Sequence, residues 1–109
     1  MPHLTKTDQE HIHKIKDQLV AKYGELINRI YCFGSRVESQ KQDTDFDVLI
    51  ITDEKIDWRL EDEISLMINY YGLKNDIFFD VIFYSADEFD GKNSFIPLIE
   101  NIRSKGVII

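Results

Sequence analysis

Hydrophobic residues recur along this chain with two different periods, and each period predicts its own kind of element. Near the start, apolar residues lie three or four positions apart with charged residues between them, which is the spacing of an amphipathic helix. This first series comprises Ile12, Ile15, Leu19 and Tyr23. Shorter runs rich in β-branched and aromatic residues, such as 46–52, are typical of strands. The alternation of the two patterns predicts helices packed on a central sheet.

Capping and breaking residues set the expected boundaries of these elements. Thr7, with Glu10 three residues later, has the pattern of a capping box at the start of the first helix. Gly72 is expected to end the second long helix, and Pro97 falls in the first turn of the last one. In order, the expected elements are a helix over 7–28, a strand over 30–33, a loop or short helical turn over 36–44, a strand over 46–52, a helix over 57–71, a strand over 77–84, a helical turn over 85–89, a helix over 94–105 and a strand over 107–109.

The connection between the first two strands decides how they pair. It is too short to contain a long crossover helix, so we expect these strands to run antiparallel or to be otherwise mixed. The predicted class is therefore an α/β (α+β) fold with a central mixed β-sheet flanked by helices, in a single domain spanning residues 1–109.

Composition narrows the class of protein further. With 43% hydrophobic and 30% charged residues in 109, neither a disordered nor a fibrous chain is expected. No apolar run approaches the ~18–20 residues that cross a bilayer, and the N-terminus has no apolar segment of an export signal. The single cysteine, Cys32, allows no internal disulfide. We therefore expect a cytoplasmic protein without a membrane partner.

The net charge bears on possible ligands. Thirteen Lys and Arg residues against twenty Asp and Glu residues give a formal charge of −7. This balance argues against direct binding to long nucleic acids, because such binding relies on basic side chains that neutralise phosphates and so release their counterions. An anionic substrate would need metal ions or a local basic patch.

Three aspartates occupy unusual positions in the expected strands. Asp45 and Asp47 lie on one face of the same strand, because side chains alternate along a strand. Asp80 interrupts the otherwise apolar run 77–83. An ionised carboxylate in such a run is costly unless a cation or hydrogen bonds compensate it. If the strands are neighbours, the carboxylates converge, and the natural compensating ligand is a hard divalent cation such as Mg²⁺.

Gly34 and Ser35 end the first strand close to these acids. Glycine lets the backbone approach an anion, and successive N–H groups with the Ser35 hydroxyl can hold phosphate oxygens. Arg36 follows, where it could reach a triphosphate, although an exposed loop arginine is an equally good interpretation. A phosphate site beside carboxylate-held metal ions is suited to in-line displacement at phosphorus.

This region resembles a known family. The run FGSRVESQKQDTDFDVLI is similar to the nucleotidyltransferase signature of the DNA polymerase β superfamily, and the chain length and element order resemble its minimal nucleotidyltransferase (MNT) branch. The resemblance implies that Gly34 and Ser35 contact the nucleotide phosphates and that Asp45 and Asp47 bind two Mg²⁺ ions. For Asp80 it implies a third metal ligand and the base for the incoming hydroxyl.

The resemblance also implies a function. We expect Mg²⁺-dependent transfer of a nucleoside monophosphate, AMP from ATP, to a hydroxyl group. MNT-branch proteins often act as antitoxins that adenylylate a tyrosine of a HEPN-type ribonuclease toxin, so a HEPN-type partner protein is implied.

Two alternatives stay open. A small-molecule nucleotidyltransferase of the aminoglycoside type is disfavoured, because the sequence shows no separate substrate domain. A non-catalytic module of the same fold that masks a partner by contact is favoured by the loop after Ser35, which is slightly shorter than usual in that branch and lacks a glycine.

Overall fold

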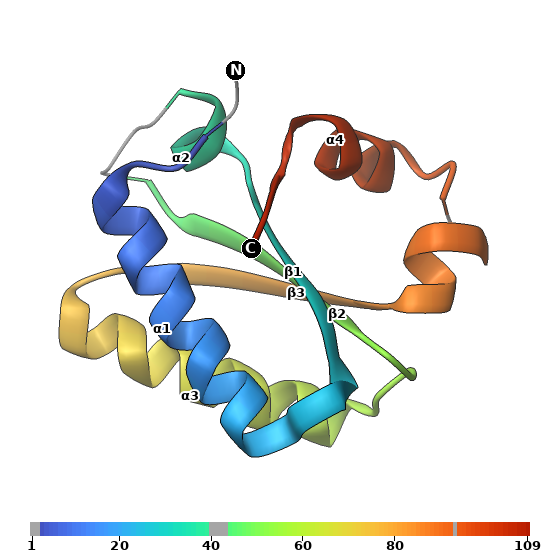
Figure 1. Cartoon of the computed structure of the whole chain (residues 1–109), viewed down its shortest axis with the longest axis horizontal. Helices are drawn as coiled ribbons and strands as arrows, with labels where there is room; N and C mark the ends of the chain where they lie inside the picture. Colours follow the sequence, from blue (N-terminus) through green and yellow to red (C-terminus); the bar gives the residue numbers. More distant parts are fainter. Residues whose placement is uncertain (1–2, 40–43, 93) are drawn as a thin grey trace.

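The structure, a computed structural model, describes residues 3–39, 44–92 and 94–109 (Figure 1). Along the chain the elements are α1 (Lys6–Tyr23), a 3-10 turn η1 (Gly24–Leu26), β1 (Ile27–Phe33), the short helix α2 (Ser35–Glu38), β2 (Phe46–Thr52), α3 (Trp58–Asn75), β3 (Phe79–Ser85), a π-helical turn η2 (Glu88–Lys92), α4 (Pro97–Lys105) and β4 (Val107–Ile108). The order of helices and strands is the predicted one.

The four strands form one mixed sheet in the order β3-β2-β1-β4. Strand β1 pairs antiparallel with β2 and with β4, whereas β2 and β3 are parallel. The antiparallel pairing of the first two strands and the mixed character of the sheet are therefore confirmed. Helix α3 makes the crossover that the parallel pair requires.

Strand β2 is buried on both faces because helices cover both sides of the sheet. Phe46, Val48 and Ile50 lie in a core closed by α1 and α3. Leu49 and Ile51 point the other way, into a second core closed by η2 and α4. Figure 1 shows α1 and α3 toward one side of the sheet and α4 toward the other. The site described below lies where β2 and β3 begin and β1 ends.

The expected start and end of the first helix are wrong, each by a few residues. The N-cap is Thr5, whose hydroxyl oxygen accepts a hydrogen bond from the Asp8 backbone N–H at 3.2 Å. The helix therefore begins before the Thr7–Glu10 pair, and no capping box forms there. It ends early because Gly24, with φ of 59°, turns the chain out of the helix and lets β1 start at residue 27.

Gly72 does not end α3, contrary to the prediction from the sequence. It is buried inside the helix, where a Cβ atom would overlap the Ile77 carbonyl and lie 2.9 Å from the Phe79 ring. The glycine is thus needed for close packing of α3 against the segment that leads into β3. The helix ends at Asn75, and Asp76 caps it in the left-handed conformation with φ of 57°.

The last helix and strand form as predicted, but the helix begins three residues later than expected and the turn before it lies at Glu88–Lys92 rather than at 85–89. Pro97 is the first residue of α4, and Gly106 separates that helix from the short strand β4. Within the described residues, each helix is either too short or too polar to cross a membrane.

Candidate active site

The turn at Gly34 brings the end of β1 against the start of β2. Gly34 has φ of 79° and ψ of −158°, a conformation that residues with a Cβ rarely adopt. Its carbonyl accepts hydrogen bonds from the N–H groups of Val37 and Glu38 at 3.1 and 2.9 Å, which starts α2. A Cβ atom at this position would overlap a carboxylate oxygen of Asp47. The close approach of glycine backbone to carboxylate therefore depends on the missing side chain.

The strand register places two of the predicted acids side by side. Asp47 is paired with Phe33 on β1 and with Asp80 on β3. The side chains of these three paired residues therefore share one face of the sheet. Asp45 lies just before β2 and is exposed; Asp80 is exposed as well, and Asp47 is half-buried. The apolar run around Asp80 suggests a buried carboxylate; the side chain is instead exposed, because β3 is an edge strand and Asp80 lies near its start.

Electrostatics couple the three aspartates. The pKa of Asp47 is raised above its ordinary value, first by its partial burial and then by the negative charges of Asp80 and Asp45. Ionising Asp47 therefore costs free energy in this protein. A cation placed among these carboxylates would remove that cost.

The carboxylates suit a hard cation by their chemistry, since oxygen ligands are those that Mg²⁺ prefers. Their side chains are not drawn together in advance: across residues 3–39, 44–92 and 94–109, no three His, Cys, Asp or Glu side chains are arranged as a ready metal site. Binding at Asp45, Asp47 and Asp80 would require these side chains to rotate, which costs little for the exposed Asp45 and Asp80.

Ser35 is exposed at the first position of α2. Its carbonyl accepts hydrogen bonds from the backbone N–H of Ser39 at 3.0 Å and from the Ser39 hydroxyl at 2.9 Å. These bonds hold the short helix closed behind the Gly34 turn. The role of Gly34 and Ser35 in holding phosphate stays a prediction.

Arg36 lies in the interior rather than in an exposed loop. Only 6% of its surface is accessible, and its guanidinium forms a buried ion pair with Asp8 at 2.9 Å. Its Nε donates to the Thr44 carbonyl at 2.9 Å, and the group stacks over the Phe46 ring at 5.1 Å. In this arrangement Arg36 ties α2 to the start of α1 and to Thr44, the residue before Asp45; its role in binding a nucleotide stays a prediction.

Sequence reasoning missed Asp8, the partner of Arg36. Asp8 is 1% exposed and lies four residues before Ile12, so it occupies the same helix face as the apolar series of α1. A charged residue in register with an apolar stripe is the signal that could have revealed a buried ion pair. Cys32 is fully buried as expected, and burial raises the pKa of its thiol, so it is a core residue.

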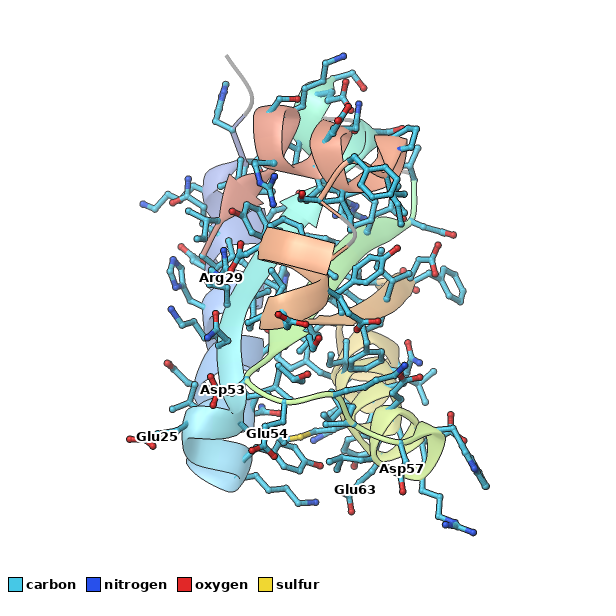
Figure 2. All side chains as sticks on the ribbon, turned by 90° about the vertical axis from the view of Figure 1, so that its right-hand side faces the viewer. Glu25, Arg29, Asp53, Glu54, Asp57 and Glu63 are labelled. Atoms are coloured by element: carbon cyan, nitrogen blue, oxygen red, sulfur yellow. The ribbon has the colours of Figure 1, made fainter. Side chains whose placement is uncertain are left out.

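A second group of acidic side chains lies at the opposite end of the molecule. Figure 2 shows Glu25, Asp53, Glu54, Asp57 and Glu63 gathered toward one end, from η1, the segment after β2, and α3. Because β2 has seven residues, roughly 23 Å separates this end from the start of β2. Asp47 is distinguished from this group by its contact with the Gly34 turn.

The arrangement of strands and helices places this chain in a general fold class, and a solved structure shares that fold. A four-stranded mixed sheet flanked by helices in one small unit is a mixed α/β fold, as the sequence predicts. One chain of the crystal structure of a mutant MntA–HpeT toxin–antitoxin complex is similar to it, with a TM-score of 0.60 and 15% sequence identity over 89% of this chain and 70% of that one. At this identity the likeness concerns the fold. The sequence matches no family model and no curated protein.

Proposed function

We propose that this protein is a Mg²⁺-dependent nucleotidyltransferase that transfers AMP from ATP to a hydroxyl group of a partner protein. The observation that carries the proposal is the contact of the Gly34 turn with Asp47, in register with Asp80. This corner combines a glycine backbone, which can approach phosphate closely, with the Asp47 carboxyl, whose pKa is raised by burial and by repulsion from the neighbouring carboxylates. The solved chain of similar fold belongs to a toxin–antitoxin complex, and we infer a comparable antitoxin role here, with a HEPN-type partner.

Each residue has a distinct part in the proposed reaction. Asp45, Asp47 and Asp80 would hold two Mg²⁺ ions, which when bound supply positive charge for the phosphates and acidify the attacking hydroxyl. Gly34 and Ser35 hold phosphate oxygens through backbone N–H groups and the Ser35 hydroxyl. The oxygen of the acceptor hydroxyl forms a bond to the α-phosphorus as its proton passes to Asp80. The bond between the α-phosphorus and the bridging oxygen breaks, and pyrophosphate leaves.

The test is transfer of label from ATP. The protein is incubated with Mg²⁺, ATP labelled on the α-phosphate, and the protein encoded by the adjacent reading frame, and label on that protein is measured. Wild type is expected to transfer label, and Asp47→Asn to lose at least about 100-fold in rate, because the substitution removes a metal ligand's charge. The matched control is Asp17→Asn, an exposed aspartate on α1, which should transfer as wild type does. Absence of label with wild type would contradict the proposal.

A second candidate is a non-catalytic module that neutralises a partner by covering it. It is favoured by the absence of a ready metal cluster among the described residues. The two candidates differ in the behaviour of Asp47→Asn toward a toxin: a masking protein would still neutralise its partner with this substitution, whereas a transferase would not.

A further inference from the structure

The outward side of α3 carries a stripe of apolar side chains. Leu66, Tyr70 and Leu73 are four and three residues apart and therefore share one face of the helix. Their exposed fractions are 71%, 62% and 81%. The core-facing side of the same helix is formed by residues such as Ile64 and Ile68, which are buried. We call Leu66, Tyr70 and Leu73 the α3 stripe.

An open groove runs along this stripe. It has a volume of ≈ 610 Å³ and is lined by α3 side chains between Glu63 and Leu73, with Lys22 of α1. The polar face of a surface helix is normally directed to solvent, so a contiguous apolar strip with a groove beside it is typical of an interaction surface. A leucine from another helix would fit between Leu66 and Tyr70.

The charges beside the α3 stripe indicate which helix would bind to it. Glu63 and Lys74 are eleven residues apart, about three helical turns, so they lie on the same flank of the stripe at opposite ends. In a two-fold, antiparallel pair of α3 helices the same flanks meet with their ends reversed. Glu63 of one copy then lies beside Lys74 of the other, and the contact occurs twice. A two-fold parallel pair would place these flanks on opposite sides of the interface, so that Glu63 and Lys74 would not meet.

The apolar residues of the two α3 stripes also face one another in this antiparallel arrangement. When Leu66 of one copy faces Leu73 of the other, the two Tyr70 side chains meet near the symmetry axis. Glu63 and Lys74 are then offset along the axis by roughly 3 Å, which their side chains span easily. Glu63 is already held in place, because its carboxylate accepts a hydrogen bond from the Tyr23 hydroxyl at 2.6 Å. Less side-chain entropy is therefore lost when the contact forms.

We propose that the α3 stripe binds a second copy of this chain, so that the protein forms a two-fold dimer through antiparallel α3 helices. The dimer interface lies on the face of α3 turned away from the sheet. The inference is independent of the proposed reaction.

Sedimentation velocity over micromolar to millimolar concentrations tests the dimer directly. Wild type should show a concentration-dependent shift from monomer to dimer, and Leu73→Asp should sediment as a monomer throughout, with an unchanged melting temperature. The matched control is Leu98→Asp, which introduces the same charge at an exposed leucine of α4 (42% exposed) and should leave the dimer intact. A wild-type protein that is monomeric throughout, or a dimer that survives Leu73→Asp, overturns the proposal.

Charge exchange distinguishes a second copy from any other partner. Lys74→Glu and Glu63→Lys should each raise the dimer dissociation constant about ten-fold, because each places like charges together at two symmetric contacts. An equimolar mixture of the two variants should regain dimers of near wild-type affinity, since every contact in the mixed dimer joins opposite charges. Failure of the mixture to recover, with both variants folded, contradicts the antiparallel arrangement.

Discussion

The aspartate at position 47 lies in an environment that opposes its own ionisation. Its carboxylate lies against the Gly34 backbone, beside the charges of Asp80 and Asp45, and its pKa is raised by burial and by those charges. Each of these effects makes the ionised carboxylate less favourable in the folded chain than in the unfolded one. Such unfavourable clustering of charge is common at sites where a ligand supplies the compensation.

This reasoning predicts that Asp47→Asn stabilises the metal-free protein at neutral pH. A carboxyl group whose pKa is raised on folding contributes stability at low pH and loses it as the pH rises through the folded-state pKa. The uncharged amide of asparagine at position 47 does not ionise and so avoids this loss of stability. A gain of about 1 kcal/mol would raise Tm by about 4 °C in a domain of this size. Thermal melts should show the advantage at pH 7 and none below the ordinary carboxyl pKa; a variant less stable than wild type at pH 7 would refute the interpretation.

Removing one partner of the buried ion pair between Arg36 and Asp8 should destabilise the protein, in contrast to Asp47→Asn. Arg36→Met removes the guanidinium that pairs with the Asp8 carboxylate, which is 1% exposed, and should cost about 3–5 kcal/mol in the free energy of unfolding. The matched control is the exposed pair of Lys105 and Glu38, 4.0 Å apart, where Lys105→Met should cost less than about 1 kcal/mol. Chemical denaturation measures both, and equal losses in the two variants would contradict the ranking.

These residues also show what a single sequence reveals about a site. Asp47 and Asp80 could be predicted because each interrupts an apolar strand, where a charge is conspicuous. The position of Arg36 could not, because its neighbours from residue 38 to 44 are polar and a polar segment is expected on the surface. Burial of Arg36 depends on Asp8, 28 residues away, and such long-range pairing leaves no local pattern.

At the scale of elements, the turn between β1 and α2 has the strictest requirement. Gly34 must adopt positive φ and must also leave room for Asp47. Gly24 also has positive φ, but a Cβ atom there would contact nothing within 4 Å. A side chain at Gly24 would therefore cause backbone strain alone, whereas a side chain at Gly34 would cause strain and steric overlap together.

The comparison of alanine substitutions uses this difference. Gly24→Ala should destabilise the protein by about 1–2 kcal/mol through backbone strain alone, and should leave the proposed transferase activity unchanged. Gly34→Ala should cost more and abolish transfer, because the Asp47 carboxylate must move. Urea unfolding with the label-transfer assay measures both effects, and an active Gly34→Ala variant would show that the contact is dispensable.

The strand over 46–52 was easier to predict than the helix ends or the start of β1, which lies at Ile27 rather than at the expected residue 30. Residues 46–52 are apolar on both faces, and the strand has the predicted boundaries. The end of α3 was misplaced because glycine has two uses: it terminates helices, and it permits close packing. Gly72 serves the second, and its contacts with Ile77 and Phe79 exist only once the chain has folded back.

For the whole molecule, the order of strands brings the candidate site together. The sequence predicts that the first two strands pair, but not that β2 lies between β1 and β3. This order places the Gly34 turn on one side of Asp47 and Asp80 on the other. The proposed activity therefore requires the folded sheet and not the FGSRVESQKQDTDFDVLI segment alone.

Binding of Mg²⁺ should accordingly be visible in global stability. A ligand that binds the folded state alone raises the free energy of unfolding by about 2.7 kcal/mol at 100 times its dissociation constant. Millimolar Mg²⁺ is expected to raise the Tm of wild type and to have little effect on Asp45→Asn. Calorimetry with and without EDTA measures this, and an equal shift in both proteins would argue against a metal site at these residues.

Strand β3 forms one border of the sheet, and the hydrogen-bonding groups along its outer side can recruit strands from other molecules. Of its seven residues, FDVIFYS, Asp80 carries the charge. A carboxylate in that place discourages intermolecular strand addition and the aggregation that follows. Neutralising Asp80 would thus reduce solubility as well as catalysis, and enzymologists should confirm that such preparations are monodisperse before attributing lost turnover to chemistry.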